Sequence, residues 1–187
     1  MLTIARATTA AEYEQALDLM AEYIAWDGAQ LREVGLDGDA FLAFYYGGQS
    51  RGDENLPGPF APPEGCLLLA TEAAEAVGCI AFRRLSADTC EMKRLFVRAR
   101  FQGQGVGRKL AETLVATARE AGYSRMVLDT TTFMKGAVAL YGSLGFRPCR
   151  PYHDIPPGFE AVTLFMELDL GAAPATGSSA TSRRAPA

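Results

Sequence analysis

Three alternating glycines give the sequence its clearest chemical signal. They are Gly103, Gly105 and Gly107, in the stretch RARFQGQGVG that runs from Arg98 to Gly107. Glycine permits tight turns and lets the backbone approach a ligand closely. An amphipathic run over 106–121 follows, and a helix that begins in such a loop presents unpaired N–H groups and the positive end of its dipole. These features predict a cradle for pyrophosphate, and therefore a nucleotide-type cofactor.

Two other interpretations of the glycines must be weighed. Dinucleotide-binding and methyltransferase folds place an acid after a helix and a strand to bind a ribose, and Asp129 stands at such a position. In those folds a buried apolar strand runs straight into the glycines, whereas here a charged strand is followed by Arg98, Arg100, Phe101 and Gln102. Only about 60 residues follow Asp129, too few for the rest of a doubly wound sheet. The other interpretation is a glycine-rich turn without a ligand.

Two runs together resemble the GNAT superfamily of acyl-CoA N-acetyltransferases. The segment Gln102–Gly107 matches its Q/R-x-x-G-x-G/A signature, and Leu140–Phe146, LYGSLGF, resembles its LYxxLGF run. Their order and spacing also agree with the family, and the resemblance covers roughly residues 77–170. It implies an α/β protein with a single-domain GNAT-like fold. The expected sheet is mixed and mostly antiparallel, with about six to seven strands, helices on both faces, and a splay between the fourth and fifth strands.

The resemblance also implies the reaction. Acetyl-CoA would be the co-substrate, and its acetyl group would pass directly to a primary amine in a ternary complex, without a cysteine intermediate. The acceptor would be a small molecule or a peptide or protein. A catalytically weak or inactive CoA-binding regulatory domain is the alternative from another functional class.

The family pattern assigns the cofactor-binding positions. The pantetheine arm would lie along the strand before the loop, at Leu95, Phe96 and Val97. The pyrophosphate would be held by backbone amides of Gln102, Gly103, Gln104, Gly105, Val106, Gly107 and Arg108. The chain departs from the pattern at Met134, where many relatives carry an asparagine that contacts pantetheine.

The same pattern suggests two catalytic residues. Glu91 would act as the base, because an alkylammonium must lose a proton before it can attack. Its alternative role is that of a strand-surface residue facing Lys93. Tyr141 would protonate the departing thiolate, and its alternative is a place in the helix core. A backbone N–H near Leu95 or Phe96 would stabilise the oxyanion.

The other elements must position these groups. Apolar residues at helical spacing predict a helix over about 10–26 and a second over about 29–46. Aromatic residues of this region would either wall the acceptor site or form core: Trp26, Phe41, Phe44, Tyr45 and Tyr46. The loop over 150–157 would overhang the active site, where Tyr152, His153 and Asp154 would touch the acceptor or simply form surface.

Strands flank the glycine loop on both sides. The run over 88–97 alternates, which predicts Glu91, Lys93, Leu95 and Val97 on one face. The following helix and the strand over 125–130 would complete a right-handed parallel crossover.

Charge is unevenly distributed along the chain. Residues 1–80 contain three basic and 13 acidic residues, whereas residues 81–187 contain 15 and nine. The basic residues around the glycine loop would attract a polyanionic cofactor, and the acidic part a cationic amine; they are Lys93, Arg94, Arg98, Arg100, Arg108 and Lys109. The net charge of −4 argues against a nucleic-acid partner.

Composition limits the remaining possibilities. The 187 residues suit one domain over 1–170, followed by a disordered tail over 171–187 that has no leucine, isoleucine, valine or aromatic residue. Four cysteines without a CxxC pair indicate reduced thiols, and a single histidine, His153, excludes a His-rich metal site. No apolar run is long enough for a membrane span, and no export signal is recognised, so we expect a cytoplasmic monomer or homodimer with no metal ion.

Overall fold

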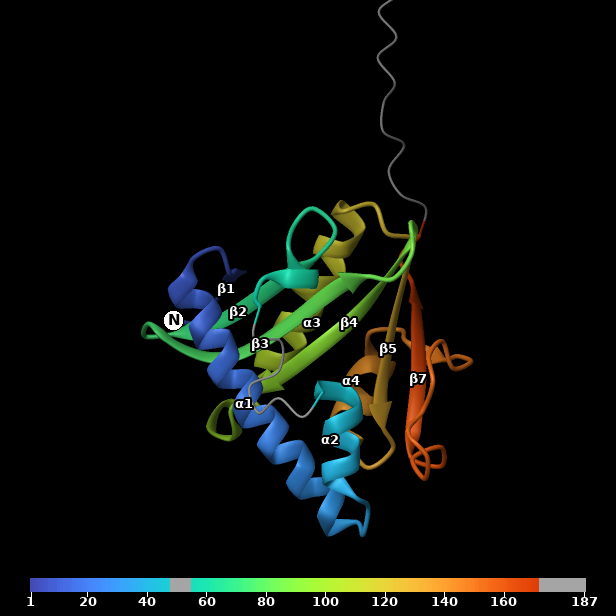
Figure 1. The fold of residues 1–187 in the computed structure, drawn as a ribbon. Helices are drawn as coiled ribbons and strands as arrows, with labels where there is room; N and C mark the ends of the chain where they lie inside the picture. Colours follow the sequence, from blue (N-terminus) through green and yellow to red (C-terminus); the bar gives the residue numbers. More distant parts are fainter. Residues whose placement is uncertain (48–54, 172–187) are drawn as a thin grey trace, which may run out of the picture.

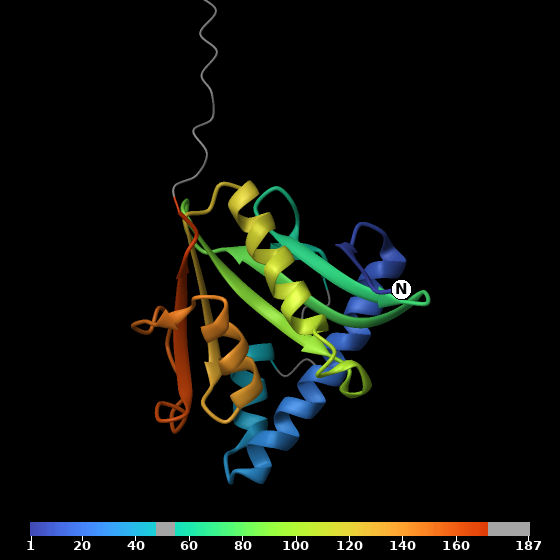
Figure 2. The same ribbon diagram turned by 180° about the vertical axis from the view of Figure 1, so that it is seen from behind.

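The computed structural model describes residues 1–47 and 55–171. Within them one mixed sheet carries helices on both faces (Figures 1 and 2). The strands are β1 (Thr3–Arg6), β2 (Cys66–Glu72), β3 (Glu75–Arg84), β4 (Thr89–Val97), β5 (Arg125–Thr131), β6 (Arg147–Pro148) and β7 (Thr163–Asp169). The helices are α1 (Ala10–Glu33), α2 (Gly38–Tyr46), α3 (Val106–Glu120) and α4 (Lys135–Ser143), with short 3-10 turns η1 (Gly58–Phe60) and η2 (Ala99–Phe101). The predicted tail lies outside the described residues except for Gly171.

The sheet divides between its two parallel strands. Its order is β1-β2-β3-β4-β5-β7-β6, and every neighbouring pair is antiparallel except β4 and β5. These two pair only where residues 89–91 lie beside residues 125–127, although both strands continue further. Figure 1 shows them diverging beyond this junction. The predicted mixed, mostly antiparallel sheet with a splay between the fourth and fifth strands is confirmed.

Alternating side chains of the strands pack into two separate cores. Leu68 on one face of the sheet packs in a cluster with Leu110 and Leu114 of α3. Leu69 points to the opposite face and packs in a cluster with Met20 of α1. This period of two places α3 behind the sheet and α1 in front of it, as the two opposite views show (Figures 1 and 2).

Helix α1 is longer than the sequence predicts. It begins with a capping box in which Thr9 and Glu12 satisfy each other's backbone N–H groups. It then continues through Trp26 to Glu33, so the predicted end at 26 and restart at 29 are wrong. A glycine inside a helix is tolerated at a cost of about 1 kcal/mol, and Gly28 therefore does not end α1. Although α1 has 24 residues, none of the described helices is both long and apolar enough to cross a membrane.

A bulge interrupts the alternation of β4. Lys93 pairs with Ala81 of β3 while Phe96 pairs with Cys79, so β4 has one residue more than β3 in this interval. Arg94 takes up the extra length with a positive φ of 61°. Such a bulge exchanges the two faces of the strand. The prediction that Leu95 and Val97 share a face with Glu91 and Lys93 is therefore wrong.

The backbones of α1 and α2 touch at Gly38, where an added Cβ would lie 2.8 Å from the carbonyl oxygen of Gly28. Gly38→Ala should push the helices apart and lower the free energy of unfolding by about 1–3 kcal/mol, measured by urea denaturation. The control is Gly142→Ala in α4, where an added Cβ meets nothing within 4 Å. This control should be neutral or stabilising by up to about 1 kcal/mol. Equal stability of the two variants would contradict the close approach.

Candidate active site

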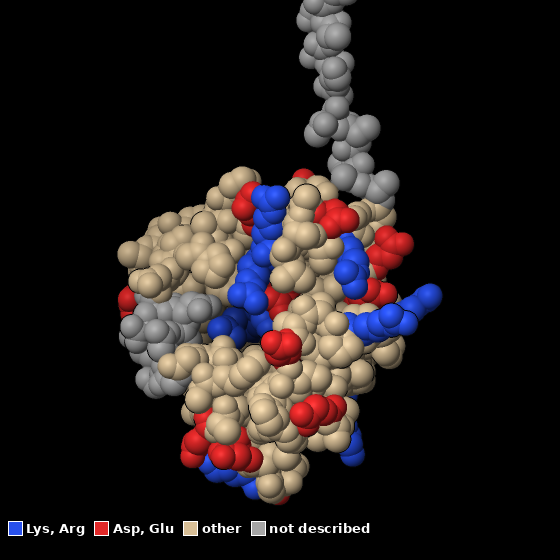
Figure 3. Space-filling model, turned by 45° about the vertical axis from the view of Figure 1, so that its right-hand side comes forward, with Lys and Arg blue, Asp and Glu red and all other residues tan. Residues whose placement is uncertain are grey.

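A cavity of about 710 Å³ lies where β4 and β5 part. Its walls come from α1, α2, β4, the glycine loop, the start of α3, β5 and α4. In a space-filling view, basic side chains run into a hollow on one side of the molecule, and acidic side chains border it (Figure 3). The split in the sheet thus brings together segments that are far apart in the sequence.

Most of the predicted cofactor-binding residues line this cavity. They are Leu95, Phe96, Val97, Gln102, Gly103, Gly105, Val106, Gly107 and Arg108. Gln104 is not among the lining residues, and its side-chain amide instead donates to the Arg100 carbonyl at 2.8 Å. Met134, the departure from the family pattern, also lines the cavity.

The glycine loop has the backbone shape that a pyrophosphate cradle requires. Gly103 and Gly105 have φ values of +73° and +81°, which other residues adopt only with strain. The Gln102 side chain donates to the Val97 carbonyl at 2.8 Å and ties the loop to the end of β4. Because the Lys109 N–H is the donor to the Gly105 carbonyl, the amides of residues 106–108 have no partner within α3. These amides and the dipole of α3 fit the diphosphate of a nucleotide-type cofactor.

The basic residues around the loop have different roles. Arg98 is paired with Glu22 at 2.6 Å and with Glu75 at 2.8 Å, and Arg100 is also paired with Glu75. These two arginines therefore fasten α1 and β3 to the end of β4 and do not line the cavity. Arg108 does line it, and so does Lys135 at the start of α4, which the sequence analysis did not single out.

Tyr141 lies on α4 and lines the cavity. Its side chain is buried, and its ring packs 5.8 Å from that of Phe146. Burial, with a smaller contribution from Asp129, raises the pKa of the Tyr141 hydroxyl above its usual value of 10.0. The hydroxyl is therefore protonated at neutral pH and can donate a proton.

Glu91 is buried in an ionic environment. Its carboxylate pairs with Arg83 at 2.6 Å and Lys93 at 2.9 Å, and it accepts from the Tyr152 hydroxyl at 3.1 Å. Burial alone would raise the pKa of Glu91, but Lys93 and Arg83 outweigh it and lower the pKa. Glu91 is not among the cavity-lining residues. Its assignment as the base stays a prediction, and this environment disfavours direct contact with an amine.

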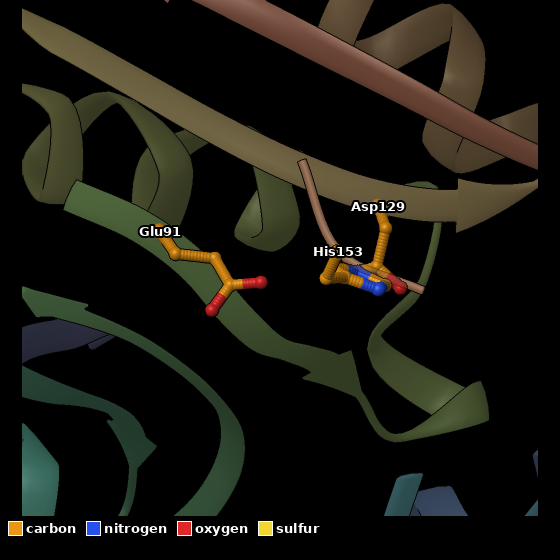
Figure 4. A group of neighbouring side chains, drawn as sticks. All are labelled: Glu91, Asp129 and His153. Atoms are coloured by element: carbon orange, nitrogen blue, oxygen red, sulfur yellow. The ribbon is translucent and has the colours of Figure 1, made fainter. Parts of the chain in front are cut away.

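Glu91, Asp129 and His153 converge from β4, β5 and the loop before β7 (Figure 4). A carboxylate oxygen of each acid and a ring nitrogen of His153 lie within 4.8 Å of one another. Such a group of atoms could hold a metal ion. The Lys93 ammonium already takes this position, at 2.9 Å from Glu91 and 2.7 Å from Asp129. Burial alone would raise the pKa of Asp129, but Lys93 and His153 outweigh it and lower the pKa. The cluster is therefore a set of alternating charges.

Aromatic side chains of α1 and α2 form part of the cavity wall. Of the predicted aromatic residues, Trp26, Phe41, Tyr45 and Tyr46 line it, whereas Phe44 is exposed elsewhere on α2. Tyr23 was not predicted and also lines it. The predicted contacts of Tyr152, His153 and Asp154 with the acceptor receive no support, because none of the three lines the cavity.

The sequence analysis also missed Asp27. Its side chain is 1% exposed and lines the cavity from α1. Met20, Ile24, Asp27 and Leu31 follow one another at steps of three and four and are all buried. A single acid within an apolar stripe was the signal that could have identified this residue, once the helix was extended past 26.

Comparison with known proteins identifies the family. The model of the Acetyltransferase (GNAT) family matches residues 36–146. The chain belongs to this family. It is therefore an acetyl-CoA-dependent acetyltransferase, as the two sequence runs predict.

Similar proteins agree with this membership. An uncharacterised N-acetyltransferase of Schizosaccharomyces pombe is 38% identical over 109 residues, which are 56% of this chain and 67% of that protein. The IAA acetyltransferase of Azospirillum brasilense is 35% identical over 114 residues, 59% of this chain and 71% of that protein. Rat N-acetylaspartate synthetase is 38% identical over 87 residues, which are 46% of this chain and only 29% of that protein.

Solved structures share the fold. A putative acyl-CoA N-acyltransferase from Klebsiella pneumoniae matches with a TM-score of 0.65 and 24% identity, covering 91% of this chain and 98% of that chain. A putative acetyltransferase from Salmonella typhimurium, solved with its cofactor acetyl-CoA, has a TM-score of 0.63 and 22% identity and covers 95% of this chain and 99% of that chain.

Gly105→Leu should strain the loop and cover its amides, and thereby raise the Kd for CoA at least about tenfold, a loss of roughly 1.4 kcal/mol. Gly122→Leu is a matched control, because Gly122 has a φ of +90° at the opposite end of the same helix. Both variants should lose similar stability, but only Gly105→Leu should lose CoA affinity in calorimetry. Unchanged affinity in Gly105→Leu would exclude the loop as the cradle.

Glu91→Gln should lower the free energy of unfolding by on the order of 3 kcal/mol, because it breaks a buried ion pair. The exposed pair of Glu167 with Arg125 provides a control, and Glu167→Gln should cost no more than about 1 kcal/mol. Urea denaturation gives both values. If Glu91→Gln kept wild-type stability but no longer transferred acetyl groups, the result would support Glu91 as the base.

Proposed function

We propose that this chain transfers the acetyl group of acetyl-CoA directly to a primary amine. The observation that carries the proposal is one continuous cavity with two unlike ends. The glycine loop and the start of α3 line one end, and aromatic residues of α1 and α2 line the other. Such an arrangement can hold two substrates in contact, which converts a bimolecular step into an effectively unimolecular one.

Direct transfer is supported by the positions of the thiols. All four cysteines lie within the described residues, and none of them lines the cavity. Burial raises the pKa of Cys79 and of Cys90 to about 12, so these two thiols are poor nucleophiles at neutral pH. A cysteine-bound acetyl intermediate therefore has no support, and the amine itself would attack the thioester.

Tyr141 would donate its proton to the departing thiolate. It lines the cavity and remains protonated, because burial raises its pKa. Residues 95–97 and 102–108 would hold the co-substrate through backbone groups. We infer that Glu91 acts indirectly, by holding Lys93 and, through it, Asp129 beside the cavity.

A small amine suits the acceptor end better than a protein does. Its rings come from the adjacent helices α1 and α2 and pack against one another. The ring centroids of Tyr23 and Trp26 are 6.4 Å apart, and those of Phe41 and Tyr45 are 4.4 Å apart. Apolar pockets of this kind typically take small molecules. The names of two relatives, IAA acetyltransferase and N-acetylaspartate synthetase, also indicate small molecules for those proteins.

The test is release of CoA thiol from acetyl-CoA over a panel of primary amines and lysine or N-terminal peptides. The proposal requires release above background with at least one small amine. Binding of CoA, seen as a raised melting temperature, without release for any acceptor would favour the regulatory domain. Release with peptides alone would overturn the assignment of a small acceptor.

Tyr141→Phe should lower kcat by about a hundredfold or more, while the Kd for CoA changes little, because only the proton donor is lost. The control is Tyr123→Phe, because Tyr123 is buried outside the cavity and its hydroxyl donates to the Glu64 carbonyl at 2.7 Å. Steady-state kinetics and calorimetry separate the two effects. A wild-type kcat in Tyr141→Phe would show that Tyr141 is not the proton donor.

A further inference from the structure

The acceptor end of the cavity contains buried polar atoms that lack a partner. They are Asp27 Oδ1 from α1 and Thr131 Oγ1 from β5, and neither has a hydrogen bond within the described part of the chain. Buried polar atoms are almost always hydrogen-bonded in folded proteins. Two such atoms in the wall of one cavity indicate a ligand that supplies the missing partners.

Asp27 is the more demanding of the two. A buried carboxylate without a partner is costly to the fold, and the stripe of α1 that carries Asp27 is otherwise apolar. The cost is offset if a ligand brings a positive charge to the Asp27 carboxylate.

Groups on four elements surround Asp27. Tyr23 belongs to the same helix, Tyr46 to α2 and Asp129 to β5. Arg94 of β4 lies over the Tyr46 ring, 4.7 Å from its centroid. Burial, with a smaller contribution from the Asp129 charge, raises the pKa of Asp27 to about 7. The carboxyl group can therefore gain or lose a proton near neutral pH.

We propose that Asp27 receives the ammonium group of the acceptor and removes its proton, and that the acceptor carries this ammonium on an apolar or aromatic body. The inference rests on the proposed function and adds a substrate class and a base to it. The apolar body would pack against Trp26, Phe41 and Tyr45, which line the same end of the cavity. Rings of this kind also attract cations.

The direction of the pKa change favours proton transfer to Asp27. In water an alkylammonium and an aspartate differ in pKa by about 6.5. Before the ammonium binds, the pKa of about 7 for Asp27 narrows this difference to about 3.4. In the complex the positive charge lowers the pKa of Asp27, while burial lowers the pKa of the ammonium. Transfer converts a buried ion pair into two neutral groups. Glu91, whose pKa is lowered, would make the same transfer less favourable.

The reaction balances with the residues of this chain. The ammonium gives one proton to Asp27, and the neutral amine forms a C–N bond to the acetyl carbon as the C–S bond breaks. Tyr141 gives its proton to the sulfur, and the second proton that nitrogen loses returns to the Tyr141 oxygen. Asp27 then releases its proton to solvent, which accounts for the one proton that the overall reaction produces.

The binding test uses two probes of the same shape, 2-phenylethylamine and 2-phenylethanol, in the presence of CoA. Trp26 is the only tryptophan of the chain and lines the cavity beside Asp27, so its fluorescence reports binding there. Wild type should bind the amine at least tenfold more tightly than the alcohol. Asp27→Asn, which keeps the side-chain volume, should lose this preference. The control Glu33→Gln, an exposed acid on the same helix, should retain it.

The turnover test measures thiol release from acetyl-CoA with 2-phenylethylamine. Asp27→Asn should lower kcat/KM at least a hundredfold, the usual contribution of a general base. Equal binding of the two probes by wild type, or a preference or rate that survives in Asp27→Asn, would overturn the proposal. Binding of the two probes does not require turnover. A wild-type protein that acetylates no amine would therefore contradict the proposed function, while the binding test would still show whether Asp27 binds an ammonium group.

Discussion

The ion pair between Lys93 and Asp129 spans the place where the sheet separates. Hydrogen bonding between β4 and β5 ends at Glu91 and Val127, and the ion pair joins the strands two residues further on, at 2.7 Å. It holds the two strands at a fixed separation where no backbone ladder does. With both partners largely buried, solvent screens the attraction only weakly. The cavity lies where the two strands part, and Lys93 and Asp129 both line it.

The two sides of the split offer different kinds of groups. On the side of α3, free backbone amides can donate to a diphosphate whatever side chains surround them. On the side of α1 and α2, side chains define the wall, through aromatic rings and a carboxylate. A backbone site can remain unchanged while the aromatic wall varies. The recognisable signature of the chain is therefore on the side of the glycine loop, whereas the proposed function assigns acceptor choice to α1 and α2.

The parts predicted from the sequence were those set by local patterns. The glycine loop, the run from Leu140 to Phe146 and the crossover between β4 and β5 each depend on residues close together in the chain. The missed features depend on tertiary contacts. Gly28 lies within α1 because α2 packs on it, and Asp27 becomes a cavity residue only in that longer helix. The pairing of Arg98 with Glu22, 76 positions earlier, gave no signal in the sequence.

The two outer strands also limit how this protein can associate. The sheet ends in β1, with four residues, and in β6, with two residues that include Pro148. Short edges and proline offer few free backbone groups for a strand from another molecule. Among the described residues, a second copy would thus find little to extend the sheet. Pairing through β1 or β6 would therefore add few hydrogen bonds, which favours helical or loop surfaces for self-association.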